Sequence, residues 1–375
     1  SGAKFFQTSP TCGDSFFDPA GATGDFSGYF ETITTICPDV PGTFAQVTFS
    51  EFDLGECCTF LEVYDFEGAW ANYLGNWQMQ NNPGTLTATT NSGCLTFRFV
   101  SQNNTPAPGW AASVSCVNCA SPNGLHVTNG VGGTVQLDWF QVATAEFYRW
   151  EIGVLGFVPG TATALFSSNT PTWTATAAGL DGNTEYDVYV RSTCLGGETG
   201  EFNGPVRFKT FPTCGDSFTD PGGADANYPI NQYSQIRICP EAPGDYVELD
   251  FSEFELAACC ASLGISDNIF YQTFTGTNSP GKVVSNSPDG CLNLTFQSND
   301  GQTAPGWQAA VNCISCAFPN AVVGGSATFS TIYFSWTGLP DATGYEWEVG
   351  LPGFTPGTGA AADAGSTSDL FATAQ

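Results

Sequence analysis

The feature that most restricts how this chain can fold is an internal repeat that carries its cysteines with it. The stretch PTCGDSFFDPAGATGDF at 10–26 returns as PTCGDSFTDPGGADANY at 212–228, an offset of 202 residues. Four cysteines recur at this offset, and three later ones recur at an offset of 197, because the first copy has five more residues in an intervening loop. The repeat therefore predicts that two parts of the chain adopt the same fold. The recurring cysteines are Cys12, Cys37, Cys57, Cys58, Cys94, Cys116 and Cys119, which return as Cys214, Cys239, Cys259, Cys260, Cys291, Cys313 and Cys316.

The number of cysteines indicates disulfide bonds and an oxidising, extracellular compartment. Fifteen cysteines are rare in a reduced cytosolic protein, and zinc sites need CxxC pairs that are matched with one another or with histidine. The chain has one histidine, and its CxxC elements are only 116–119 and 313–316. Cys119 opens a unit and Cys194 lies near its end, so we predict a Cys119–Cys194 bond and leave Cys316 without a partner.

The repeat also suggests that the chain is a window cut from a longer tandem array. The offset of 197 holds as far as Gln375, which corresponds to Ala178 and therefore precedes the counterpart of 179–194. At the other end, GAKFFQTSPTC at 2–12 aligns with GPVRFKTFPTC at 204–214. We therefore expect residues 1–11 to be the last strand of a preceding domain.

Composition excludes several classes of function. The net charge of −28, from 36 acidic and 8 basic residues, would repel nucleic acid and anionic membrane surfaces. A hydrophobic content of 42% with 31 phenylalanines is enough for packed cores. No continuous apolar run of about 18 residues occurs, so we expect no membrane insertion in this segment.

Short alternating stretches such as AQVTFSEF, TFLEVYDF and CLTFRFVS are typical of half-buried strands, and no stretch shows a helical period of helical length. Frequent Gly, Pro and Asn between them indicate turns. We therefore predict an all-β chain, a string of antiparallel β-sandwich domains. The expected segments are 1–11, 12–116, 117–212, 213–313 and 314–375.

Residues 12–116 and 213–313 resemble the CUB domain. The resemblance rests on an early pair of cysteines, on TFSEFDL followed by CTFLEVYD, and on CLTFRFVS with GWAASVSC at the close. SGCLTFRF and PGWAA are particularly similar to bacterial CUB-like modules. The resemblance implies Cys12–Cys37 and Cys214–Cys239 as the first bond of each copy.

The connectivity of the adjacent cysteines in GECCTFLEVYD (55–65) stays open at this stage. Consecutive Cα atoms lie about 3.8 Å apart, below the usual ~4.4–6.8 Å of a disulfide. Because adjacent side chains of a strand point to opposite faces, Cys57 and Cys58 could each bond one of Cys94 and Cys116. The resemblance to bacterial modules favours the alternative, in which Cys94 pairs with Cys116 and Cys57–Cys58 forms a vicinal ring.

Residues 117–212 resemble a fibronectin type III domain, through VQLDWF with Trp139, FYRWEIGV, and GLDGNTEYDVYVRS. In that family the Leu180 position is buried and the Tyr186 position braces a late corner. Residues 314–375 repeat the pattern in part, with Trp336 in the place of Trp139. We refer to the first and second CUB-like segments (12–116 and 213–313) and to the first and second fibronectin-like segments (117–212 and 314–375).

Many CUB domains bind Ca²⁺ through oxygen ligands that include an Asp just after the middle cysteine. Here that position holds Thr59 in the first copy and Ala261 in the second, and the candidate ligand Glu56 has Ala258 as its counterpart. We therefore expect the family site to be lost and predict no cofactor. A weaker alternative calcium site consists of Asp14, Asp18 and Asp25.

Catalysis finds little support, and we predict no catalytic residue. A nucleophilic triad would need His126, which stands in NGLHVTNG and has no histidine counterpart in the second copy. We interpret it as a surface or edge histidine. The loop at 67–84 is rich in aromatic residues, and Trp70 and Tyr73 are candidate ligand contacts for a sugar or a partner protein, although packing is the favoured role.

Alternating segments of these two kinds resemble the large repetitive adhesins of gliding and other surface-attached bacteria, which are often exported by the type 9 secretion system. The resemblance implies an extracellular, cell-surface stalk or filament that is structural and adhesive rather than catalytic. Its partners would be other surface proteins, glycans or like chains. The alternative is a set of ancillary, carbohydrate-binding modules of a secreted hydrolase.

Overall fold

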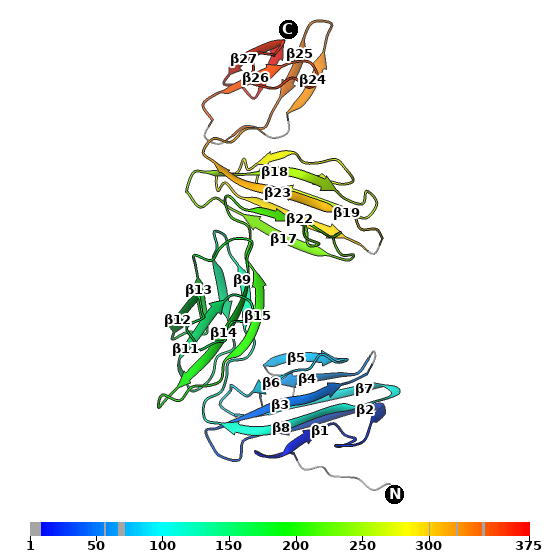
Figure 1. Ribbon diagram of the computed structural model, residues 1–375, viewed down its shortest axis with the longest axis vertical. Helices are drawn as coiled ribbons and strands as arrows, with labels where there is room; N and C mark the ends of the chain where they lie inside the picture. The colour runs from blue at the N-terminus through cyan, green and yellow to red at the C-terminus, as the bar shows by residue number, and fades with distance from the viewer. Residues whose placement is uncertain (1–8, 56–57, 67–71, 300, 320–321, 340–341) are drawn as a thin grey trace. The chain divides into compact units, whose positions relative to one another are not determined.

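The computed structural model describes residues 9–55, 58–66, 72–299, 301–319, 322–339 and 342–375. Within these ranges the chain forms strands and turns without a helix (Figure 1), and the strand pairs whose registers are described run antiparallel, as β1 with β8 and β16 with β23 do. The prediction of an all-β chain of antiparallel sandwiches is confirmed. No helix long and apolar enough to cross a bilayer is found among these residues.

The chain divides into two compact units, which are described separately. The first consists of Ser1–Thr128, Gln136–Ala177 and Glu185–Phe208, and the second of Asn129–Val135, Ala178–Thr184 and Lys209–Gln375. The strands of each sheet come from one of the segments expected from the sequence. The division into five segments stays a prediction, and most of 1–11 lies outside the described residues.

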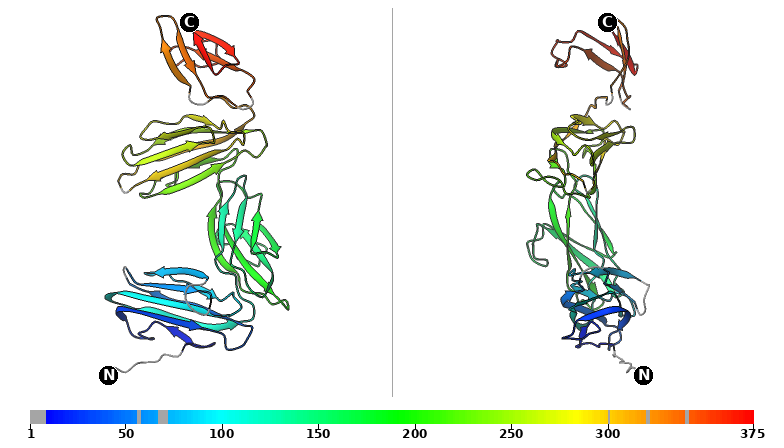
Figure 2. Two further views of the ribbon diagram at one scale, coloured as in Figure 1. Left: turned by 180° about the vertical axis from the view of Figure 1, so that it is seen from behind. Right: turned by 90° about the vertical axis from the view of Figure 1, so that its right-hand side faces the viewer.

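The first CUB-like segment forms two four-stranded sheets, with strand orders β1-β8-β3-β6 and β2-β7-β4-β5. Figure 2 shows these strands in two layers. The core lies between the layers, where Phe16 of one sheet meets Phe97 of the other, with ring centroids 5.0 Å apart. The strands are β1 (Ser15–Phe17), β2 (Phe26–Ile36), β3 (Phe44–Asp53), β4 (Phe60–Tyr64), β5 (Tyr73–Gln78), β6 (Thr85–Thr87), β7 (Leu95–Ala107) and β8 (Gly109–Val117).

The first fibronectin-like segment has seven strands in two sheets, with orders β13-β10-β9 and β12-β11-β14-β15. Trp139 is buried and lies 5.4 Å from Tyr148 between ring centroids, and Leu180 and Tyr186 are buried as the resemblance implies. The strands are β9 (His126–Asn129), β10 (Val135–Asp138), β11 (Ala145–Gly153), β12 (Phe166–Thr170), β13 (Thr174–Ala177), β14 (Glu185–Cys194) and β15 (Asn203–Lys209).

The second CUB-like segment repeats the topology of the first, with orders β16-β23-β18-β21 and β17-β22-β19-β20. Its core packs Trp307 against Phe296, with ring centroids 4.9 Å apart. In the first copy Trp110 packs against Phe99 at the same distance. The internal repeat of the sequence is therefore a repeat of structure. The strands are β16 (Ser217–Thr219), β17 (Tyr233–Ile238), β18 (Tyr246–Glu255), β19 (Ala261–Ser266), β20 (Tyr271–Phe274), β21 (Lys282–Val284), β22 (Leu292–Ser298) and β23 (Gly306–Ile314).

The second fibronectin-like segment forms a three-stranded sheet, β24-β25-β28, and a two-stranded one, β26-β27. Its small core contains Phe334 and Trp336, the latter in the place of Trp139. The strands are β24 (Val323–Ala327), β25 (Ile332–Ser335), β26 (Tyr345–Val349), β27 (Asp363–Thr367) and β28 (Phe371–Ala374).

Two of the expected disulfide pairings are wrong. Cys12 bonds Cys116 and Cys37 bonds Cys94, so neither Cys12–Cys37 nor Cys94–Cys116 forms. The reason is strand order. Strand β1 pairs with β8, and continuing the register Ser15↔Ser113 by three residues places Cys12 opposite Cys116. Cys37 and Cys94 likewise lie one residue beyond the pair Ile36↔Leu95, with Cα atoms 4.2 Å apart.

The second copy follows the same connectivity, with Cys214–Cys313 and Cys239–Cys291, so Cys214–Cys239 is also wrong. The vicinal ring is confirmed there, because Cys259 and Cys260 bond each other. In the first copy Cys58 is disulfide-bonded, while Cys57 lies outside the described residues.

The predicted Cys119–Cys194 bond is confirmed, and Cys316 is a free, exposed cysteine.

Candidate functional site

A buried carboxylate organises the end of β4 in the first CUB-like segment. Asp65 follows this strand directly and is 1% exposed. Both of its carboxylate oxygens accept the backbone N–H of Thr89 at 2.9 Å, and one also accepts the Thr89 hydroxyl. Burial raises the pKa of Asp65 and outweighs the hydrogen bonds from Thr89 and Thr90, which lower it. The carboxylate thus fixes the backbone of 89–90.

The segment that Asp65 fixes is hydrogen-bonded to the first fibronectin-like segment within the same unit. The N–H of Ala143 donates to the carbonyl oxygen of Thr89 at 2.8 Å. Two residues earlier, the side-chain amide of Asn123 donates to the carbonyl oxygen of Thr87. Asn123 is 4% exposed, so this contact is sheltered from water. A chain of hydrogen bonds therefore runs from the Asp65 carboxylate to the following segment.

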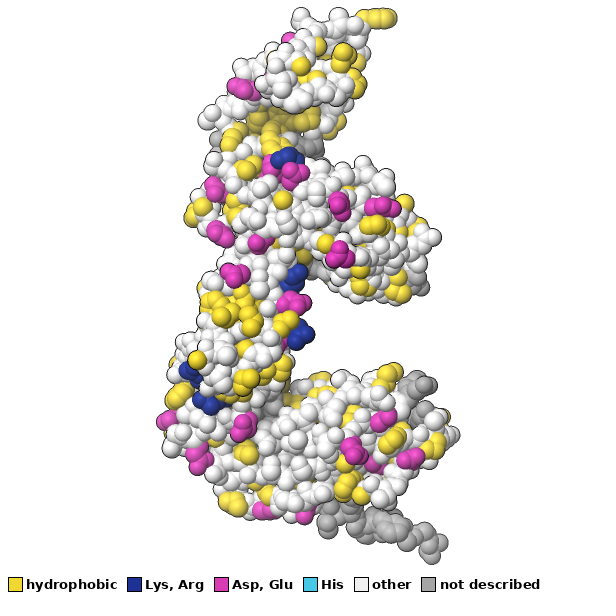
Figure 3. Space-filling view, in the orientation of Figure 1, with side chains coloured by type: hydrophobic (Ala, Val, Ile, Leu, Met, Phe, Trp, Pro, Cys, Tyr) yellow, Lys and Arg dark blue, Asp and Glu magenta, His cyan; other side chains and the backbone are white. Residues whose placement is uncertain are grey.

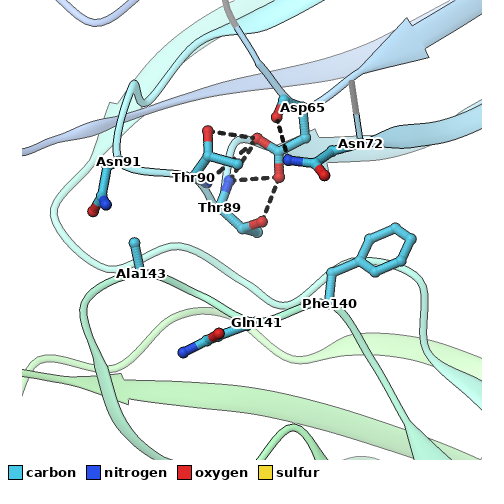
Figure 4. A pocket seen from close by; sticks show the side chains of 8 residues that line it. All are labelled: Asp65, Asn72, Thr89, Thr90, Asn91, Phe140, Gln141 and Ala143. Carbon is cyan, nitrogen blue, oxygen red and sulfur yellow. Dashed lines mark hydrogen bonds between the residues drawn. The ribbon is translucent and has the colours of Figure 1, made fainter. Parts of the chain in front are cut away.

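A polar pocket of about 440 Å³ opens beside this chain of hydrogen bonds. Figure 4 shows Asp65, Thr89 and Thr90 on one side and Phe140 and Gln141 on the other. The side chains around the opening are exposed, and the Phe140 ring is 41% exposed. The lining residues are Asp65, Asn72, Thr89, Thr90, Asn91, Phe140, Gln141 and Ala143.

The second copy keeps the carboxylate and changes the rim. Asp267, at the position of Asp65, accepts the N–H of Asn286 at 2.6 Å. Asn286 stands at the position of Thr89, and its side-chain amide donates to the carbonyl oxygen of Phe318 at 3.2 Å. At the positions of Asn91, Phe140 and Gln141 the second copy has Pro288, Thr337 and Gly338. The backbone anchor is therefore common to both copies, whereas the exposed side chains belong to the first.

Only one signal in the sequence points to this pocket. Asp65 and Asp267 both follow a strand at the offset of 202. Such a recurrence marks a position that both copies need. The partners Thr89 and Ala143 come from a loop and from another segment, and nothing in their local sequence indicates that they meet.

His126 lies on the surface, as interpreted from the sequence. Its side chain is 65% exposed, and its Nδ1 lies 3.3 Å from Oδ1 of Asp138, whose side chain is 47% exposed. This pair belongs to the start of β9 and the end of β10.

The residues of the alternative calcium site have other partners. The carboxylate of Asp14 accepts the N–H and the hydroxyl of Thr11, and that of Asp18 accepts the N–H groups of Ala20 and Trp110. In the second copy Asp216 and Asp220 make the same kinds of bond.

The family calcium position lacks its aspartate in both copies. Thr59 is buried, Ala261 carries no oxygen ligand, and Glu56 lies outside the described residues. In the part of the chain that the structure describes, no group of three or more acidic, cysteine or histidine side chains could hold a metal ion. A site made of Asp14, Asp18 and Asp25 stays an untested expectation.

Of the two aromatic candidates, Tyr73 is described and Trp70 lies outside the described residues. Tyr73 begins β5 and packs against Tyr64, with ring centroids 5.5 Å apart, while 48% of it remains exposed. Burial raises the pKa of its hydroxyl, and the Glu62 carboxylate raises it further. Tyr73 adjoins Asn72, which lines the pocket.

No family model matches the chain, and no curated protein matches it. Several solved structures do. The CUB1-EGF-CUB2 domain of human MASP-1/3 is 15% identical over 80% of this chain and 98% of that one, with a TM-score of 0.24. Domains FN1-FN3 of chicken CNTN1 are 14% identical over 68% and 88%, with a TM-score of 0.21. These are domains of the two kinds that the sequence resembles, and no functional argument rests on them.

Proposed function

We propose that this chain is a repeat segment of an extracellular adhesin stalk or filament on a cell surface, with a mechanical and adhesive role. The observation that carries the proposal is the pairing of terminal cysteines. In each CUB-like segment the first cysteine bonds the last, as Cys12–Cys116 and Cys214–Cys313. In the fibronectin-like segment between them, Cys119–Cys194 also joins positions near the two ends.

This pairing keeps tension away from the strands that lie within the bonded loops of the first three segments. Strand β15 follows Cys194 and lies outside these loops, so the backbone of 195–213 carries the force to Cys214. A force along the chain enters the first segment at Cys12 and leaves it at Cys116, so the covalent bond transmits it. In the three consecutive segments these bonds join cysteines with sequence separations of 104, 75 and 99. Between Cys116 and Cys119 only Val117 and Asn118 transmit the force through the backbone alone.

Stability alone does not require this arrangement. In the loop-entropy model a disulfide stabilises by restricting the unfolded chain, typically by roughly 2–4 kcal/mol and more for a longer loop, but the model does not require that the bond join the ends of a segment. A Cys12–Cys37 bond would also stabilise the fold, but it would leave the remainder of the segment exposed to tension. The observed connectivity supports a protein that is pulled.

The surface supports the same proposal. Figure 3 shows Asp and Glu side chains spread over the visible face with few Lys and Arg. Like charges on neighbouring chains repel one another, which keeps extended surface proteins apart. Cell-surface attachment, gliding and export by the type 9 secretion system belong to this proposal and rest on the sequence resemblance. Other surface proteins, glycans or like chains are the proposed partners.

Single-molecule pulling of the whole chain by its ends tests the proposal. Replacing Cys12 and Cys116 together by serine should add one extension step that the oxidised wild type lacks. The remaining Cys37–Cys94 bond keeps 57 of the 104 residues out of the stretched path, so a length of 47 residues can extend. The added step should therefore measure about 16 nm.

The matched control replaces Cys37 and Cys94 by serine. It also removes one disulfide from the same segment, but it leaves the Cys12–Cys116 bond to transmit the force. This variant should show no added step. An added step in the control, or its absence in the Cys12/Cys116 variant, would refute the mechanical role.

A further inference from the structure

We propose that the polar pocket beside Asp65 binds an uncharged sugar residue of a glycan. The inference rests on the chemistry of the lining and not on the mechanical proposal. The pocket volume of about 440 Å³ is that of a small-ligand site. Its lining divides into a floor whose polar groups already have partners and a rim whose side chains face the solvent.

The floor is rigid because its groups hold one another. The Asp65 carboxylate accepts hydrogen bonds from the N–H and the hydroxyl of Thr89. The carbonyl oxygen of Thr89 in turn accepts the N–H of Ala143. A ligand therefore meets a surface that is already shaped. Pre-organisation of this kind lowers the entropic cost of binding.

The rim offers groups that suit hydroxyls. Asn91 and Gln141 are exposed and line the pocket from two different segments, and Asn72 lies at its edge. A side-chain amide donates and accepts hydrogen bonds at the same time, and a sugar hydroxyl does the same. Amides on two sides of a pocket therefore match neighbouring hydroxyls of one sugar ring.

Phe140 supplies an apolar face within this polar rim. Its ring lies against Gly124, where a Cβ would come within 2.8 Å of a ring atom. Gly124 has φ +65°, a conformation that favours glycine, so this residue suits both the backbone and the ring packing. The exposed part of the ring carries negative charge on its face and attracts the weakly positive C–H groups of a sugar.

Charge disfavours ionic small ligands at this pocket. None of the eight lining residues is Lys or Arg, and the chain as a whole carries −28, so phosphate, sulfate and acidic sugars are disfavoured. A cation finds only Asp65, whose oxygens already accept from Thr89. An uncharged polyol meets neither obstacle, and its hydroxyls match the amides of the rim.

The second copy separates the floor from the rim. In the second copy the Asp267 carboxylate accepts the N–H of Asn286, so this copy keeps the carboxylate-to-backbone bond. The rim changes in the second copy. Asn91 becomes Pro288, Phe140 becomes Thr337 and Gln141 becomes Gly338, so both amides and the aromatic ring are lost. The rim side chains of the first copy are therefore not needed for the carboxylate-to-backbone bond. Ligand binding is the role that we assign to them.

Saturation-transfer NMR on the whole 375-residue chain tests the site, with cellobiose, lactose, mannobiose and chitobiose as probes. We expect at least one probe to bind at millimolar concentration, and Phe140→Ala and Gln141→Ala to weaken it at least tenfold. The matched control Thr337→Ala, at the Phe140 position of the second copy, should bind as the wild type does. Gln141 is exposed, so its variant reports on binding even if Phe140→Ala loosens the fold.

Four outcomes would overturn the proposal. None of the four disaccharides binds, or binding survives both rim substitutions, or sialyllactose binds more tightly than lactose. Loss of binding in Trp70→Ala with full binding in Phe140→Ala would place the ligand on the aromatic loop and would also refute this site. None of these results alters the expected pulling behaviour, so the two proposals fail independently.

Discussion

The carbonyl oxygen of Thr89 accepts a 2.8 Å hydrogen bond from the N–H of Ala143, a residue that lies 54 positions later in another sandwich. Thr89 is in turn held by Asp65 through its own N–H and hydroxyl. One residue thus joins a buried carboxylate to the start of the next fold. The junction between the two segments depends on a side chain that does not itself touch the second one.

Replacing Asp65 by alanine should loosen this junction as well as the first sandwich. The buried N–H and hydroxyl of Thr89 would lose their acceptor, which costs about 1–3 kcal/mol for an unsatisfied buried group. Urea unfolding should show this loss, and hydrogen exchange at the Ala143 N–H should become faster. Equal exchange at Ala143 in wild type and variant would contradict the link. Asp53→Ala is the control, because Asp53 is only partly buried and its carboxylate accepts from the Gly55 N–H and the exposed Gln80 amide, neither of which leads to Ala143.

The pH dependence of stability should carry the signature of Asp65. Burial raises its pKa in the folded protein above the ordinary value of 3.8. The folded state then binds the proton more tightly than the unfolded state, so the stabilisation is fully present below pH 3.8 and is lost as the pH rises through the raised pKa. As the pH falls from 7 to 4, the unfolding free energy of the wild type should therefore rise relative to that of Asp65→Asn. A difference between the two proteins that stays constant with pH would contradict the raised pKa.

Gly109 and Gly306 should tolerate no side chain. Each has a positive φ, +82° and +87°, and a Cβ there would overlap the carboxylate of Asp18 or Asp220. Gly13 has φ +96° but open space around it, so it isolates the backbone effect. We expect Gly13→Ala to cost about 1–2 kcal/mol through strain alone. Gly109→Ala and Gly306→Ala should cost a further ~1–3 kcal/mol through overpacking. Thermal unfolding that ranks the three variants as equal would refute the steric term.

The sheets could be predicted from the sequence because alternation and the repeat act locally. AQVTFSEF reads as a half-buried strand and lies within β3, and the same pattern at the offset of 202 gives β18. Strand order could not be predicted in this way. The first strand β1 pairs with the last strand β8, so Cys12 meets Cys116 rather than the nearer Cys37.

The pocket escaped prediction for a related reason. Phe140 and Asn91 lie in loops of different segments, and only the folded junction brings them to one pocket. Asn is common in loops, and a single Phe in a loop reads as a packing residue, so neither residue type indicated a pocket. The carboxylate itself was foreseeable, because an aspartate that follows the same strand in both copies is more than a chance surface charge.

The two kinds of disulfide should differ sharply in their effect on stability. Cys239–Cys291 closes a loop with a sequence separation of 52, whereas Cys259–Cys260 closes a separation of 1. In the loop-entropy model the long loop is worth about 4 kcal/mol at 25 °C, and a vicinal pair restricts the unfolded chain far less. Replacing Cys239 and Cys291 by serine should therefore lower the unfolding free energy by about 2–4 kcal/mol. The Cys259/Cys260 double serine variant should lower it by less than about 1 kcal/mol, because its loop is the shortest that a chain can form. Denaturant titrations of both variants against the wild type provide the comparison. An equal or larger loss for the vicinal pair would show that the ring shapes the start of β19 rather than merely ending the preceding turn.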